Sequence, residues 1–130
     1  MPAERSRKEE SHDTLCEELL KERAAVLSRA GLAVEDALAE LTKLDNEIAV
    51  KKMRLQSLSL HSHARENRRQ RRDLIDEINV NIEQFNNVHK RAQLKYYNLI
   101  VTREALGLRR HDIIQEIYII PGKKKKIKVS

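Results

Sequence analysis

Residues 20–58, LKERAAVLSRAGLAVEDALAELTKLDNEIAVKKMRLQSL, carry a seven-residue repeat of aliphatic side chains. An apolar stripe kept at this period over several heptads needs a second helix beside it, because an isolated helix would leave the stripe in water. The pattern therefore predicts a first coiled-coil segment over residues 13–60 that pairs with a protein partner. The members of this first seam are Leu20, Leu27, Val34, Leu41, Leu44, Ile48, Leu55 and Leu58, with Arg23 and Lys51 as polar exceptions.

A second apolar seam follows in a different phase and predicts another coiled-coil segment over residues 74–106. Residues 61–73 separate the two as a polar, arginine-rich phase break, where Ser62, Arg65, Arg69 and Arg72 stand at positions that should be apolar. Polar residues inside a seam, such as Lys51 and His89, commonly select a particular partner. The members of the second seam are Ile75, Ile78, Ile82, Phe85, Ala92, Tyr96 and Leu99.

Glycine and proline, the residues that most often build turns, do not occur between Gly31 and Gly107. We therefore expect one long helix from about Thr14 to Leu106, on the order of 140 Å long. Thr14 and Glu17 have the spacing of a capping box, and residues 1–12 are polar enough to form a flexible lead-in. Gly31 costs about 1 kcal/mol relative to alanine and predicts a weak point in this helix.

Residues 107–130 change in character. Gly107 is placed to end the helix as a C′ glycine. The second half of Ile113–Ile120, which ends at Pro121 and Gly122, predicts a short strand, at an edge or in a hairpin, that should lean on a partner. The fold class expected for the whole chain is all-α, an extended helix or coiled coil with a short strand-like C-terminal segment and flexible ends.

Several function classes are disfavoured by the residues present. Charged residues make up 35% of the chain and aromatic residues 3%, which is typical of long helices rather than of a globular enzyme core. The scattered glycines form no phosphate loop, and the histidines have no zinc spacing. Cys16 has no base beside it in sequence and is expected to be a structural residue at a d position. We therefore expect no enzyme activity, no cofactor and no metal.

The expected location is cytoplasmic. The chain has no apolar run long enough to cross a bilayer, and charged residues occupy the part of Met1–Glu10 where a signal peptide would be apolar. A single cysteine fits a reducing compartment.

Two basic blocks account for much of the net charge of +6. Both are candidates for binding an anionic surface. The alternative for both is that the charged side chains contact only solvent. Nucleic-acid binding by the arginine block is disfavoured because no aromatic residue interleaves with it for base stacking. The lysine block fits an anionic membrane, a solvated tail or a nuclear-import patch equally well. The blocks are Arg65, Arg68, Arg69, Arg71 and Arg72, and Lys123, Lys124, Lys125 and Lys126.

The order of a long coil, then Thr102–Arg110 (TREALGLRR), then Ile113–Pro121 (IIQEIYIIP) resembles the autophagy Barkor/UVRAG family. The resemblance implies a non-catalytic regulatory subunit of the class III phosphatidylinositol 3-kinase complex. Such a subunit pairs in parallel with a Beclin-like partner on autophagic or endosomal membranes. A similar order of elements occurs in kinetochore Spc-type subunits, and a homodimeric structural rod is a further alternative.

Overall fold

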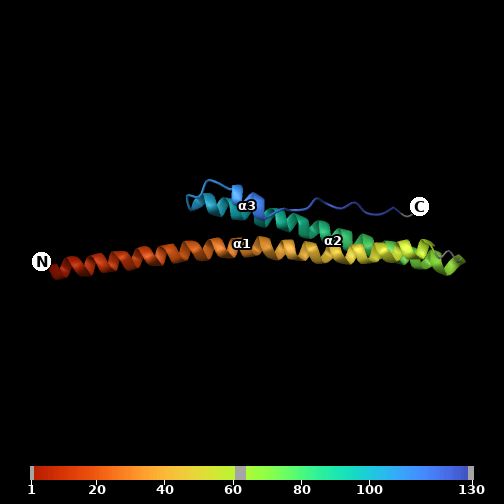
Figure 1. Cartoon of the computed structure of the whole chain (residues 1–130), viewed down its shortest axis with the longest axis horizontal. Coiled ribbons are helices and arrows are strands. Elements are labelled where there is room, and N and C mark those ends of the chain that lie inside the picture. Colours follow the sequence, from red (N-terminus) through yellow and green to blue (C-terminus); the bar gives the residue numbers. More distant parts are fainter. Residues whose placement is uncertain (1, 61–63, 129–130) are drawn as a thin grey trace.

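The computed structural model describes residues 2–60 and 64–128, with side chains described over 6–58 and 65–128. Its elements are α1 (Pro2–Leu60), α2 (Ala64–Ala105) and the short α3 (Asp112–Ile117). Within the described ranges there is no strand, so the predicted all-α fold is confirmed. Helix α2 lies antiparallel against the second half of α1, and the first part of α1 projects beyond the end of α2 (Figure 1).

The prediction of one continuous helix is wrong, because the chain reverses between Leu60 and Ala64. The reversal falls inside the predicted phase break; His61, Ser62 and His63, which belong to that break, lie outside the described residues. Folding back allows the two seams to cover each other, whereas a straight rod without a partner would leave both in water. The free energy gained by burying both seams outweighs the cost of reversing the chain without glycine or proline. The single-helix prediction was based on the absence of those two residues.

The core of this helical hairpin is made of the two predicted seams. Phe85, Leu41, Ile48, Ile78, Ile82 and Val34 are the largest side chains that are fully buried. Burying one such side chain contributes about 1.5–3 kcal/mol. From Val34 onward the two seams therefore pack against each other within one chain. Also buried on these seams are Ala37, Leu44, Ile75, Ala92 and Leu99, with Leu55, Leu58 and Tyr96 half-buried.

Hydrogen bonds among three polar residues set the register of the hairpin. Lys51 Nζ donates to Asn81 Oδ1 at 2.6 Å, and Asn81 Nδ2 donates to Glu47 Oε2 at 3.2 Å. Asn81 is buried, so a shift in register would take away both of its partners on α1 and leave only the bond from its Nδ2 to Gln84 Oε1 within α2. Glu40 and Arg91 add an ion pair between the same helices. The polar exception at Lys51 thus selects the chain's own second helix.

The start of α1 differs from the prediction. The helix begins at Pro2, so residues expected as a flexible lead-in are helical. Thr14 Oγ1 donates back to the Glu10 carbonyl at 2.8 Å, which is an interaction inside a helix and not a capping box. The helix also continues through Gly31 without a break. A Cβ at that position would lie 3.4 Å from the hydroxyl of Tyr118.

The C-terminal part begins as predicted and then departs from the prediction. Gly107 has a φ of +86° and ends α2, with the Leu108 N–H donating to the Arg103 carbonyl at 2.9 Å. The expected short strand is wrong, because residues up to Ile117 form α3 and no strand follows it within residues 118–128. From Tyr118 the chain is extended, and residues 118–128 run back along α2 (Figure 1).

Candidate interaction surfaces

Two asparagines of α2 hold the extended segment by its backbone. Asn86 accepts from the Lys124 N–H and donates to the Lys124 carbonyl, both at 2.9 Å. Asn79 does the same with Ile127, at 2.8 and 2.9 Å. Seven helical residues rise about 10.5 Å, and three extended residues span about 10 Å. The two side-chain amides are therefore spaced to bind backbone groups three residues apart in the segment. They form the hydrogen bonds that a neighbouring strand would otherwise form.

The lysine block is attached to the hairpin by this clamp. Lys124 Nζ lies 2.5 Å from Asp45 Oδ1 on α1 and 4.8 Å from the centre of the Phe85 ring. Lys126 Nζ lies 3.7 Å from Glu83 on α2. Two of the four lysines therefore already have acidic partners within the chain, while Lys123 and Lys125 are exposed.

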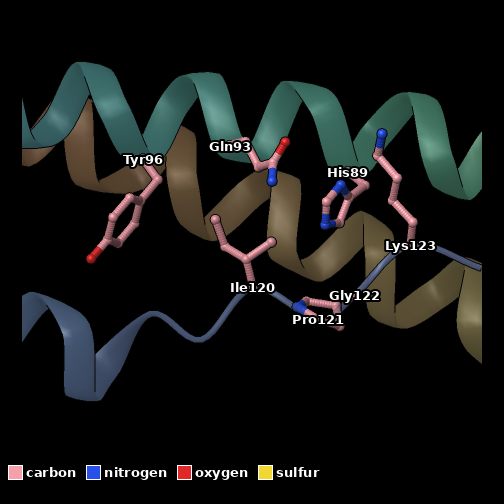
Figure 2. A pocket seen from close by; sticks show the side chains of 7 residues that line it. All are labelled: His89, Gln93, Tyr96, Ile120, Pro121, Gly122 and Lys123. Carbon is pink, nitrogen blue, oxygen red and sulfur yellow. The ribbon is translucent and has the colours of Figure 1, made fainter.

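A shallow pocket opens between α2 and the extended segment (Figure 2). It is lined by His89, Gln93 and Tyr96 on one side and by residues 120–123 on the other. Figure 2 shows the His89 ring directed from α2 toward Pro121 and Gly122. His89 is only 4% exposed, and its Nδ1 has no hydrogen-bond partner within the described part of the chain. The histidine expected to select a partner is instead buried against the extended segment of its own chain.

Replacing His89 with leucine is expected to stabilise the protein by about 1 kcal/mol. A buried polar atom without a partner costs about 1–3 kcal/mol, and leucine has a similar volume without that atom. Chemical unfolding followed by circular dichroism measures the change. Gln93→Leu, one turn further along and exposed, is the matched control and should change stability by less than about 0.5 kcal/mol. A destabilised His89→Leu variant would show that Nδ1 has a partner in solution.

The part of α1 that projects beyond α2, which we call the α1 arm (residues 6–27), carries an uncovered apolar stripe. Leu15, Leu19 and Leu20 are 54%, 48% and 65% exposed. Leu27 is partly covered, so the stripe continues directly into the hairpin core. Cys16 is exposed on the same stripe, with its Sγ 3.7 Å from His12 Nε2, and its structural role at a d position stays a prediction. The first seam is therefore paired from Val34 onward and unpaired at Leu20.

The two ends of the molecule carry opposite charges. Residues 9–18 of the α1 arm contain five carboxylates and neither lysine nor arginine. The arginine block begins α2, at the far end of the hairpin from the arm (Figure 1). All five of its arginines are exposed, and none forms an ion pair among the described residues. The structure thus distinguishes a free arginine block from a partly bound lysine block.

The segment that carries the family resemblance forms a fixed junction. Arg103 Nη2 donates to the Arg110 carbonyl at 2.8 Å, and His111 Nε2 lies 3.1 Å from Glu104. Tyr118 donates to Glu35 on α1 at 2.8 Å. Burial raises the pKa of the Tyr118 hydroxyl above its ordinary value, and the Glu35 carboxylate raises it further. The junction therefore directs the extended segment back along the hairpin.

Comparison of the chain with protein-family models, with curated proteins and with solved structures found no match. No described helix has the length and apolar content needed to cross a membrane. Three or more His, Cys, Asp or Glu side chains do not gather as a metal-binding group anywhere in the described ranges.

Proposed function

We propose that this chain is a non-catalytic assembly subunit that binds a helical partner through the α1 arm. The observation that supports this is the apolar stripe of the arm, which is exposed although its continuation forms the hairpin core. A helix gains most of its stability from packing an amphipathic face, and contiguous exposed apolar surface marks interaction sites. The hairpin then serves as the base from which the arm projects.

The resemblance over residues 102–121 gives this proposal its most specific form. On that reading the chain is a regulatory subunit of a class III phosphatidylinositol 3-kinase complex, and its partner is a Beclin-like chain. The hairpin adds a condition, because Val34–Leu58 and Ile75–Leu99 already cover each other. Pairing with another chain therefore starts at the arm, and it can extend further only if the hairpin opens.

Changing Leu19 and Leu20 to aspartate should remove this binding and leave the hairpin folded. Each leucine contributes about 1.5–3 kcal/mol when buried in an interface, so we expect a loss well above tenfold in the amount of bound partner. The measurement is affinity purification of the full chain from cells, with quantification of the chains that co-purify by mass spectrometry. Circular dichroism checks that the hairpin is intact.

The matched control changes Val80 and Leu94 to aspartate, since these residues are each 55% exposed but lie on α2. A chain that binds through the arm should be lost from the Leu19 and Leu20 variant and retained by this control. Equal recovery of every co-purifying chain from both variants would refute the role given to the arm.

A further inference from the structure

We propose that the α1 arm of one copy docks antiparallel on the arginine row of a second copy, so that copies join head to tail. The arginine row is defined as Arg65, Arg69 and Arg72, at the start of α2. This inference rests on the proposed function, because it uses the same arm and names its partner.

The acidic residues of the arm lie along one edge of its apolar stripe. Glu10, Asp13 and Glu17 are spaced i, i+3 and i+7, which places them on one side of a helix over about 10.5 Å. Leu20 follows Asp13 by seven residues and adjoins this edge. A partner that covers the stripe therefore meets three carboxylates in a row, and it is favoured if it carries positive charge at the same spacing.

The arginine row has the same spacing in the opposite chain direction. Counted backward from Arg72, Arg69 is three residues away and Arg65 is seven. An antiparallel arrangement therefore pairs Glu10 with Arg72, Asp13 with Arg69 and Glu17 with Arg65, all in one register. All three arginines are exposed and free of ion pairs within the described chain, so they are available to this partner.

The positions of the two surfaces require separate copies. The arm and the arginine row lie at opposite ends of the rod (Figure 1), so an arm cannot reach the row of its own chain. Because α2 runs opposite to α1, a copy displaced along the rod brings its arm antiparallel to α2 of its neighbour. Such a contact between different surfaces propagates into a chain of copies.

Pairing between two arms is disfavoured by the same charges. The acidic run of residues 9–18 would face another acidic run in the parallel arrangement and in the antiparallel arrangement centred on residues 13 and 14. Like charges placed opposite each other across a helical interface destabilise the pairing. The arm therefore favours the arginine row over a second arm.

Sedimentation of the purified full chain tests the proposal. We expect concentration-dependent association that weakens between about 0.05 M and about 0.5 M salt, because screening acts on exposed ion pairs. An arm-reversed variant (Glu10→Lys, Asp13→Lys, Glu17→Lys) and a row-reversed variant (Arg65→Glu, Arg69→Glu, Arg72→Glu) should each associate at least tenfold more weakly. An equimolar mixture of the two should regain association, because each arm then meets a row of opposite charge. The chain with all six changes should regain it too.

The control variant reverses Glu18 and Glu22, which lie on the other side of the arm, and should associate like the unchanged chain. Overturning results are a chain that stays monomeric at every concentration, reversed variants that associate normally, or a mixture that fails to regain association. Each of these excludes head-to-tail docking.

The single exposed cysteine separates failure of this inference from failure of the proposed function. A photoreactive crosslinker attached to Cys16 should join the arm to residues 65–77 of α2 in a second copy of the purified chain. If crosslinking in a cell extract instead joins Cys16 to a different identified chain, and Leu19→Asp with Leu20→Asp abolishes that product, head-to-tail docking falls and the proposed function stands. If Cys16 crosslinks to no other chain in either setting, both fall.

Discussion

Replacement of Phe85 by alanine is expected to lower the free energy of unfolding by about 3–5 kcal/mol. Phe85 is 2% exposed and is the largest fully buried side chain, so its removal leaves a cavity where the two seams meet. The ring also lies 4.8 Å from Lys124 Nζ, so its loss weakens the attachment of the extended segment. Urea unfolding followed by circular dichroism at a helical wavelength measures the change.

Tyr97→Ala is the matched control for this prediction. Tyr97 is an aromatic residue of the same helix, but it is 64% exposed and faces away from α1. Its replacement should change the free energy of unfolding by no more than about 0.5 kcal/mol. Comparable losses in the two variants would mean that α2 does not pack on α1 through the Phe85 face, and the hairpin itself would be in question.

Changing both Asn79 and Asn86 to alanine should release the extended segment from α2. The double variant removes four hydrogen bonds to the backbone of Lys124 and Ile127. At about 0.5–1.5 kcal/mol for each bond, the segment loses about 2–6 kcal/mol of docking free energy. Hydrogen exchange should then be at least tenfold faster at the Lys124 and Ile127 amides, while α1 and α2 remain helical.

Asn87 provides the control for the asparagine clamp, because it lies next to Asn86 but is exposed on the outer side of α2. Asn87→Ala should leave the exchange rates of Lys124 and Ile127 unchanged. If the double variant also leaves them unchanged, the segment is held by Ile120 and Ile127 against the core, and the asparagines are not its clamp.

Sequence alone predicted the helical content, both apolar seams and the end of α2. These features are local: a heptad repeat fixes which face of a helix must be buried, and Gly107 supplies a conformation that other residues rarely adopt. The start of α1 was less predictable, since Thr14 and Glu17 match a capping box but lie inside a helix. A short polar segment at a chain end gives no local reason to choose between coil and helix.

The same local logic missed the asparagine clamp. Asn79 and Asn86 are seven residues apart beside the second seam, and Ile120 and Ile127 repeat at the same interval in the extended segment. The two spacings match, but the match has a meaning only when the extended segment is known to lie beside α2. The sequence led us to expect a short strand before Pro121, and only the fold shows that side-chain amides of α2 hold an extended segment in place of a second strand.

What the sequence determined by itself is therefore which residues must be hidden from water, and at which period. What only the tertiary structure decided is what hides them: Val34–Leu58 is covered by the chain's own Ile75–Leu99, while the stripe from Leu15 to Leu20 is left open. The physical reason is that burial of apolar surface is non-directional and is satisfied equally by a partner chain or by the same chain folded back. The choice depends on where the helix ends and how far α2 reaches, and those distances exist only in three dimensions.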